Sequence, residues 1–211
     1  VLTRAAHVIA LDRFMADRLF KKLSPAQNGR LKERMTVMPP WPHEDTLEVV
    51  SHENNWFREK HNLNGKFVFM YSGNHGPSNP VTTILQAALK MQESPEDKNT
   101  LFMFVGGGVG KKEVDQTIER EKPTNIRSLP YQPFKDLRFS LSAADVHMVT
   151  VGNDVVGVVH PCKIYGAMAV SRPILLGAPD PCHASDSVRD NQAGWHIPHG
   201  DVDGAVKLIR R

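Results

Sequence analysis

Apolar residues follow two alternating patterns from residue 67 onward. Continuous apolar runs over 67–71 and 101–105 are typical of parallel strands that are buried on both faces. Shorter runs predict further strands at 125–129, 146–149, 173–176 and 194–197. Between the strands, helices are expected over 81–91, 111–121, 134–143 and 162–170, with a last one opening at residue 201.

Strand and helix therefore alternate at least five times. Right-handed crossovers then require an α/β fold, with a doubly wound, mostly parallel, Rossmann-like sheet that carries helices on both faces. Ligands of such sheets bind beyond the carboxyl ends of the strands. The loops that follow the strands are consequently where chemistry is expected.

The first 55 residues lack this alternation. Helical spacing over 14–23 is followed by a polar stretch, a short apolar run at 35–38, and Pro39, Pro40 and Pro42, which cannot continue a strand ladder. One helix and one short strand hold too little apolar surface to fold alone, so residues 1–45 are not expected to be an independent domain. Both chain ends read as interior sequence, which predicts a segment of a longer protein.

Composition adds only weak constraints. The 211 residues are 40% hydrophobic and 23% charged, as in ordinary globular proteins, and the net charge of +3 without a long basic run does not favour a nucleic-acid partner. Cys162 and Cys182 form neither a disulfide framework nor a metal motif, so a reducing compartment is the default. No apolar run approaches the ~20 residues that would span a bilayer.

Two glycine-rich loops follow the first two apolar strands. In Ser72-Gly73-Asn74-His75-Gly76, backbone amides at a strand end could hold phosphate, although a plain tight turn accounts for this sequence equally well. The loop at 106–110 is neither a dinucleotide fingerprint, which would need glycine where Lys111 stands, nor a phosphate-binding P-loop. A flexible strand-to-helix loop near the ligand is expected there.

A third loop, at 157–169, leads into a helix. Pro161 suits the first helical turn, whereas Lys163 puts a positive charge where the helix dipole disfavours it. A lysine placed against its local preference favours pairing with phosphate, and the alternative is a solvated surface lysine. His160 and Cys162 suggest a metal or a nucleophile, but sequence spacing offers neither a further ligand nor an orienting group. No metal is expected.

In this order and spacing, the loops resemble the family 4 glycosyltransferases, retaining enzymes with two facing Rossmann-like domains (the GT-B fold). The run from Pro161-Cys162-Lys163-Ile164-Tyr165 through Ala169 to Arg172-Pro173 is similar to the Pro-Ser-Lys-x-Tyr stretch of one branch. That branch includes cell-surface polysaccharide and N-acetylaminosugar transferases. Further similar segments are 6–19, 37–42, 71–74, 104–108, 125–131 and 143–146.

The resemblance implies that residues 46–211 bind a nucleotide-diphosphate sugar, the donor substrate, in a domain whose C-terminus is truncated. Residues 1–45 would be the tail of the acceptor domain and the interdomain crossing. The full-length cytoplasmic enzyme would transfer a hexosyl or N-acetylaminosugar group to a glycan or lipid-linked acceptor in polysaccharide biosynthesis, without a cofactor. The implied partners are the donor and the missing N-terminal acceptor domain, and the family also allows peripheral association with the inner face of the membrane. The chain alone is expected to be inactive.

The donor diphosphate would face the loop at 73–76 and the helix opening at Pro161, with the base near Pro130 and Tyr131. No catalytic residue is assigned. The expected donor-binding residues are Gly73, Asn74, His75, Gly76, Gly107, Tyr131, His160, Cys162, Lys163 and Tyr165.

The chain departs from the family pattern at two glutamates eight positions apart, where it has Val158 and Gly166. In the family the second glutamate holds the ribose hydroxyl groups. The arginine and lysine that often follow the first-strand glycine are absent from 74–80, and Ser171 replaces the usual glycine before Arg172. Lys163 is then the expected partner of the phosphate charge.

Two other functions stay open. The chain could bind a nucleotide sugar without transferring it, as the missing glutamates permit, or belong to a hydrolysing epimerase of the same two-domain architecture. A response-regulator receiver would need an acidic cluster at the strand ends, and the sequence shows none.

Overall fold

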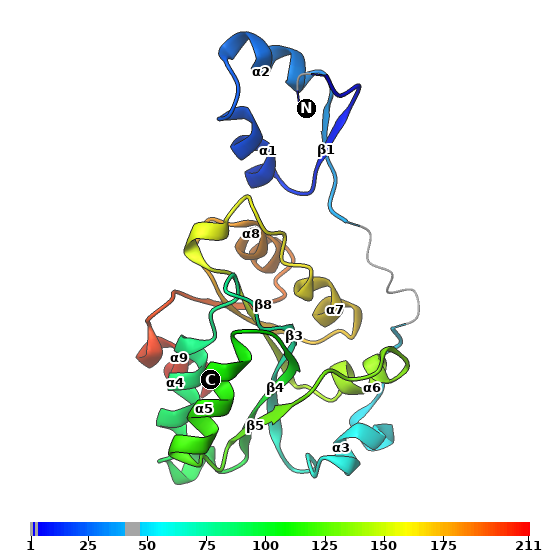
Figure 1. Ribbon diagram of the computed structural model, residues 1–211. Coiled ribbons are helices and arrows are strands. Elements are labelled where there is room, and N and C mark those ends of the chain that lie inside the picture. Colours follow the sequence, from blue (N-terminus) through cyan, green and yellow to red (C-terminus); the bar gives the residue numbers. More distant parts are fainter. Residues whose placement is uncertain (1, 3, 41–46) are drawn as a thin grey trace.

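The computed structural model describes residues 2, 4–40 and 47–211, and its main body is a six-stranded parallel sheet (Figure 1). The strand order is β5-β4-β3-β6-β7-β8, and every pairing is parallel. The predicted α/β class is thereby confirmed. The strands are β3 (Phe67–Asn74), β4 (Thr100–Gly107), β5 (Ile126–Leu129), β6 (Val146–Thr150), β7 (Ile174–Gly177) and β8 (Gly194–Ile197).

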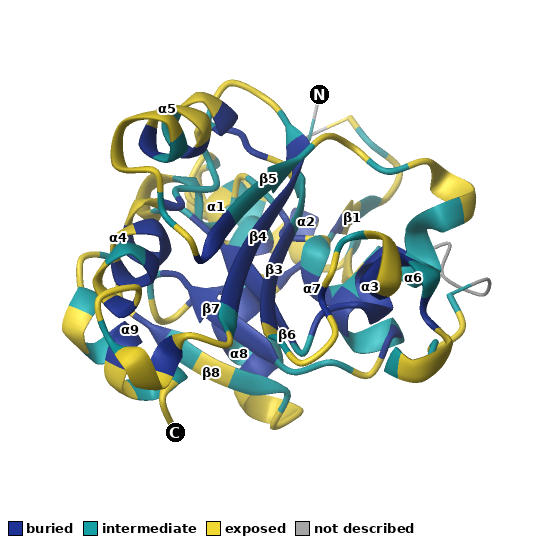
Figure 2. Ribbon diagram, turned by 90° about the horizontal axis from the view of Figure 1, so that it is seen from below, coloured by how far each residue is buried: buried dark blue, intermediate teal, exposed yellow. Residues whose placement is uncertain are grey.

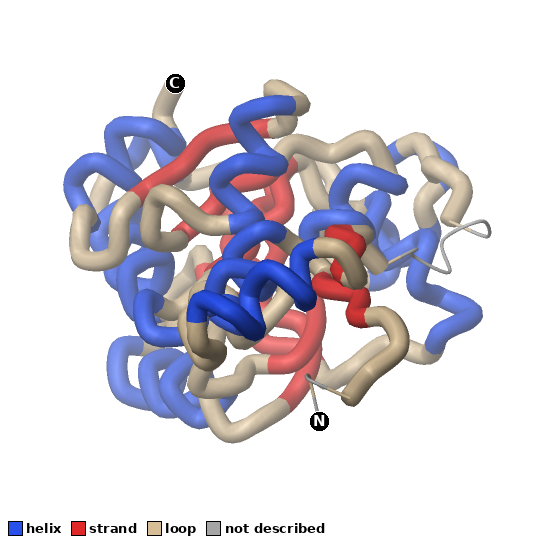
Figure 3. The backbone as a smooth tube through the Cα atoms, turned by 90° about the horizontal axis from the view of Figure 1, so that it is seen from above, coloured by secondary structure: helices blue, strands red, loops and turns tan. Residues whose placement is uncertain are grey.

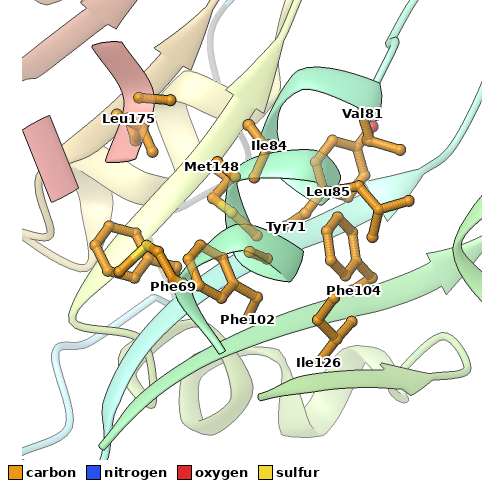
Figure 4. Close-up of a cluster of buried hydrophobic side chains, with 14 of the residues drawn as sticks. Phe69, Tyr71, Val81, Ile84, Leu85, Phe102, Phe104, Ile126, Met148 and Leu175 are labelled. Carbon is orange, nitrogen blue, oxygen red and sulfur yellow. The ribbon is translucent and has the colours of Figure 1, made fainter. Parts of the chain in front are cut away.

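Helices cover both faces of this sheet, and the central strands are buried between them (Figure 2). On one face, Phe69, Tyr71, Phe102 and Phe104 pack in one cluster with α4, α5 and α9 (Figure 4). Alternate residues such as Val68 and Met70 meet α3 and α6 on the opposite face. The helices are α3 (Trp56–Lys60), α4 (Thr82–Met91), α5 (Lys111–Glu121), α6 (Leu137–Ser142), α7 (Lys163–Ala169), α8 (His183–Asp190) and α9 (Val202–Ile209).

Residues 4–40 form a small N-terminal unit with more regular structure than the sequence indicated. It contains β1 (Val8–Ala10), α1 (Arg13–Phe20), α2 (Pro25–Lys32) and β2 (Met35–Val37), and β1 pairs with β2 in parallel. The expectation of one helix and one strand was wrong, because the polar stretch after residue 23 folds into α2. Pro25 opens α2, and the Gln27 side chain accepts a hydrogen bond from the Ser24 amide.

Other predicted boundaries also change. Helix α8 was missed because its buried face consists mostly of small or polar residues, Ala184, Ser185 and Val188. The helix expected over 134–143 begins as a 3₁₀ turn, and α6 starts at Leu137. Helix α7 starts at Lys163 rather than at Pro161. The predicted boundary between residues 45 and 46, and residues 41–42 of the predicted crossing, lie outside the described residues.

The N-terminal unit lies against the loop that follows β6, on the side of the sheet where the strands end (Figures 1 and 3). Arg18 of α1 donates a hydrogen bond to the Val156 carbonyl, and Arg13 pairs with Asp186 of α8. The carboxyl ends of the strands and the N-terminal unit therefore bound the same region of the molecule.

Candidate functional site

A cavity of about 400 Å³ opens at the carboxyl ends of the central strands. It is lined by residues at the ends of β3 and β4, by the segment after β5, and by α7. Its volume suits a small-molecule ligand, and its position is where α/β sheets bind ligands. Four of the residues predicted from sequence line it: Gly73, Tyr131, Cys162 and Lys163.

A larger, more polar hollow of about 730 Å³ lies around α3. It flanks the segment that enters β3, at the amino end of the sheet, where α/β folds seldom bind ligands. The Arg58 guanidinium in its wall already donates to the carbonyls of Ala143, Leu63 and Lys66. The cavity at the strand carboxyl ends is therefore the better candidate.

Close approach of β3 and β4 explains the glycines at the edge of the cavity. Gly73 and Gly106 are paired in register, and both have φ of +129°. A Cβ atom on Gly106 would overlap the Gly73 carbonyl, and one on Gly73 would lie 2.8 Å from Cε of Lys163. Glycine at position 73 thus gives the Lys163 side chain room to lie over the end of β3.

Lys163, the first residue of α7, has donor capacity left. Its Nζ atom lies 3.4 Å from Asn79 Oδ1 and 5.2 Å from the Tyr71 ring centroid. No carboxylate pairs with it among the residues that the structure describes. Burial lowers the pKa of this ammonium group, because its charge is partly removed from water. An anion in the cavity would relieve that cost.

Aromatic side chains form the outer wall of the cavity. The Tyr131 ring lies over Gly107, and its hydroxyl donates to the Gly107 carbonyl at 3.3 Å. Tyr131 and Phe134 are 58% and 74% exposed although both are large and apolar, which suits stacking with a planar ligand group. The sequence indicated Tyr131 but missed Phe134, because nothing local shows which way its ring points.

The other residues of the first glycine loop have different surroundings. His75 is fully buried; its Nδ1 lies 3.1 Å from the Gly73 carbonyl, and its Nε2 has no hydrogen-bond partner within the described ranges. Burial, with the nearby Lys111 charge, lowers the pKa of His75 to about 4, so its ring is neutral at pH 7. Gly76 is also buried, whereas Asn74 is exposed beside Gly108. The His75 side chain therefore belongs to the interior rather than to the cavity wall.

His160 and Tyr165 face away from the cavity, toward α1 and α8. His160 Nδ1 donates to Asp12 at 2.9 Å, and its Nε2 lies 2.8 Å from the Tyr165 hydroxyl, which in turn lies 3.1 Å from His183 Nε2. Sequence spacing offered no carboxylate near His160. The fold supplies one from 148 residues away.

Lys111 is a further cation that sequence reasoning did not assign. It is buried, and its ammonium donates to the carbonyls of Phe104, Gly106 and Leu129 at 2.7 to 3.1 Å. Burial lowers its pKa. The group joins the ends of β4 and β5 and holds the loop at 106–110 beside the cavity.

Val158 and Gly166 occupy the two positions that carry glutamates in the family that the sequence resembles. Val158 is exposed in the loop before α7, and Gly166 lines the cavity. At Gly166 there is no carboxylate to accept hydrogen bonds from ligand hydroxyl groups. The cavity thus offers one ammonium group, close backbone and aromatic edges, which suit an anionic ligand with a planar ring.

Comparisons with known proteins agree with this geometry. The family described as glycosyl transferases group 1 matches residues 53–211. The chain is 27% identical over 209 residues to a probable glycosyltransferase, WbjE, of Pseudomonas aeruginosa, a match that covers 99% of the chain and 50% of that relative. It is 24% identical over 174 residues to a putative colanic acid biosynthesis glycosyl transferase, WcaI, of Escherichia coli, covering 82% of the chain and 40% of that relative.

Among solved structures, Anabaena Alr3699/HepE in complex with UDP-glucose superposes with a TM-score of 0.74 at 17% identity, covering 98% of this chain and 53% of that one. This likeness shows a shared fold. The chain spans about half the length of the curated relatives it matches. Within the described part of the chain, no helix is long and apolar enough to cross a membrane.

Proposed function

The chain belongs to the glycosyl transferases group 1 family, and we propose that it is the donor-binding part of a retaining GT-B glycosyltransferase. The donor is a nucleotide-diphosphate sugar, and the product is a glycan or lipid-linked saccharide of polysaccharide biosynthesis. The observation that carries the proposal is the Lys163 ammonium, which lies over Gly73 in a cavity at the strand ends and has no carboxylate partner in the described structure. The relative named for colanic acid biosynthesis supports the polysaccharide assignment.

In this proposal the diphosphate lies against the end of β3. Lys163 supplies the charge-assisted hydrogen bond, and the glycine at 73 leaves room for this side chain over the end of β3. Helix α7 has only seven residues, so few peptide dipoles add at its start, and the lysine charge attracts the phosphate more strongly than the helix dipole does. The base stacks at Tyr131 and Phe134, beyond the diphosphate.

The identity of the base and sugar is part of the proposal. The fold shared with a UDP-glucose complex makes uridine diphosphate the first donor moiety to test. The run Pro161-Cys162-Lys163 with Tyr165 supports a donor sugar of the hexosyl or N-acetylaminosugar class, because it resembles the branch that transfers these groups. No cofactor and no resident metal are needed, since the Lys163 charge meets the phosphate directly.

Residues 1–45 are proposed to be the end of an acceptor domain and the crossing between domains. Ile9, Val37 and Met38 of the N-terminal unit are about half exposed although they are apolar, and a two-stranded parallel sheet is too small to be stable alone. Preceding chain that extends this sheet would cover them. The full-length enzyme would work in the cytoplasm, at the inner face of the membrane where lipid-linked acceptors lie. Limited proteolysis that released two separately stable pieces would contradict this division.

Titration calorimetry on the full 211-residue chain tests the proposal, with UDP, GDP and ADP and the matching nucleosides as probes. One nucleoside diphosphate should bind clearly more tightly than its nucleoside, because the phosphates reach Lys163. The chain should transfer no sugar, because catalysis needs an acceptor held opposite the donor. Absence of binding for every diphosphate would overturn the donor-site assignment, and transfer by the chain alone would overturn the division into domains.

A binding module without transferase activity is the second candidate, and a GT-B epimerase the third. Val158 and Gly166 favour the binding module, because neither supplies the carboxylate found at these positions in the family. Product analysis on the longer protein separates the three. A transferred sugar with retained anomeric configuration supports the transferase, a changed free sugar supports the epimerase, and binding without turnover supports the module.

A further inference from the structure

Helix α1 contacts the loop that leads into α7 at both of its ends. Arg18 donates to the Val156 carbonyl at 3.4 Å. A Cβ atom on Gly157 would lie only 2.6 Å from the Phe14 carbonyl oxygen, so the two backbones are in close contact. The loop that precedes Lys163 is therefore supported by the N-terminal unit as well as by its own domain.

A buried chain of hydrogen bonds continues this contact. The side chains of Asp12 and His160 are each 2% exposed and are joined at 2.9 Å. A carboxylate only accepts, so His160 Nδ1 carries the hydrogen of this bond. The Tyr165 hydroxyl lies within hydrogen-bond distance of both His160 Nε2 and His183 Nε2. Four residues from three parts of the chain thus form one network.

Metal binding is a weaker explanation of the same cluster. Asp12, His160 and His183 each offer one candidate ligand atom within 4.8 Å of the others. However, the two imidazole rings are tilted against each other, with centroids 4.3 Å apart and planes inclined by 35°. Each of the ring nitrogens named above already has a hydrogen-bond partner within the protein, which a metal would have to displace.

We propose that Asp12 is a positioning residue for the donor phosphate, which acts through His160 on the start of α7. The inference rests on the proposed donor site. The His160 carbonyl accepts from the Cys162 amide at 3.0 Å, and the His160 ring bonds to Tyr165, so the same residue fixes the chain on both sides of Lys163. Asp12 sets where His160 lies. The unit that precedes the donor domain therefore contributes to donor affinity without touching the donor.

The physical basis is the cost of a misplaced buried carboxylate. Asp12 and His160 are both removed from water, so their geometry must be satisfied or the buried charge is left unpaired. A shift of the N-terminal unit would pull His160, and the start of α7 would move with it. Changes along such a network typically alter affinity at a linked site by about two- to thirtyfold.

Two substitutions at Asp12 separate this role from helix capping. Asp12 also caps α1, since its Oδ1 accepts from the Met15 amide at 2.8 Å. Asp12→Ser keeps a capping oxygen but is too short to reach His160. Asp12→Asn keeps the cap and presents an amide to His160, and the network can reverse its donors and acceptors because the imidazoles change tautomer. A matched control is Asp201→Ser, which alters the aspartate cap of α9, where Asp201 accepts from the Gly204 amide.

Calorimetry with UDP and uridine on the full chain provides the test, beside thermal unfolding. Asp12→Ser should weaken UDP binding about three- to thirtyfold and leave uridine binding unchanged, whereas Asp12→Asn and Asp201→Ser should bind UDP like the wild type. Equal UDP affinity in Asp12→Ser and wild type would overturn the inference while the donor site stands. Parallel loss of UDP and uridine binding would show a general folding effect and overturn it too. A wild type that binds no UDP would instead refute the uridine donor site itself.

Discussion

Replacing Lys163 by alanine removes the one ammonium group that, within the described residues, reaches the donor cavity with donor capacity to spare. Its Nζ has only a 3.4 Å contact with the Asn79 amide oxygen and a cation–π contact with Tyr71. A charge-assisted hydrogen bond to phosphate is worth about 1.5–3 kcal/mol, so affinity for UDP should fall roughly 10- to 150-fold. Uridine should bind nearly as before, because the base is expected at Tyr131.

Protein stability should change little in this variant. The cation–π contact with Tyr71 contributes about 0.5–1 kcal/mol, and removing a partly buried charge offsets part of that loss because its desolvation cost disappears. Thermal unfolding of Lys163→Ala should thus stay within a few degrees of wild type. Lys163→Met keeps the aliphatic chain over Gly73 without the charge, and it should lose UDP affinity as alanine does.

Lys207→Ala is the matched control, since it removes the same charge from an exposed position on α9. If Lys163→Ala and Lys207→Ala lose equal affinity for UDP, the overall positive charge of the protein explains binding and a direct contact with Lys163 does not. Equal losses for UDP and uridine in Lys163→Ala would point to a distorted fold. No loss for either ligand would mean that Lys163 is only a solvated surface residue, which would refute its assignment to the phosphate.

Three further predictions follow from the same geometry. Gly73→Ala should weaken UDP binding about as much as Lys163→Ala, because alanine rarely adopts the φ of +129° found there and its Cβ, 2.8 Å from the lysine Cε, would displace the ammonium group; unchanged calorimetric affinity would contradict this. UDP and 2′-deoxy-UDP should bind within about threefold of each other, because Gly166 has no carboxylate for the ribose hydroxyl groups; a strong preference for UDP would reveal another ribose ligand. Burial lowers the pKa of both His75 and His147 to about 4, against about 6.5 in the unfolded chain, so their neutral forms support folding above pH 6.5. That support should be lost as pH falls from 6.5 to 4, by up to about 3 kcal/mol per histidine. Urea unfolding should follow this slope, and His147→Gln should flatten it.

The sheet could be predicted from sequence because parallel strands buried on both faces read as continuous apolar runs. β3 and β4 are of this kind, and their side chains fill clusters on opposite faces. Helices α2 and α8 could not be read in the same way. Only Leu31 is buried in α2, and α8 buries small or polar side chains, so neither shows an apolar stripe.

In the candidate site, too, some residues could be recognised from their local sequence, whereas the surroundings of others depend on distant parts of the chain. Gly73 and Lys163 stand in loops whose composition is unusual by itself, and the fold brings both to one cavity. The surroundings of His160 depend on Asp12, 148 residues away, and on the tertiary placement of His183. No local pattern encodes such a pairing, so sequence reasoning read His160 as a ligand-facing residue, whereas its ring turns toward the N-terminal unit.

Lys111 and Lys163 both lie near the strand ends and are at least partly buried, but only Lys163 is proposed to bind the donor. Burial lowers the pKa of both Lys111 and Lys163. An ammonium group has three donors, and Lys111 uses all of them on the carbonyls of Phe104, Gly106 and Leu129. Lys163 uses at most one, weakly, and lies at the cavity. To bind Lys111, a phosphate would have to break hydrogen bonds that the ammonium group already makes with carbonyl groups. At Lys163 it would instead accept hydrogen bonds from donors that are still free, so Lys163 is the lysine expected to contribute to affinity.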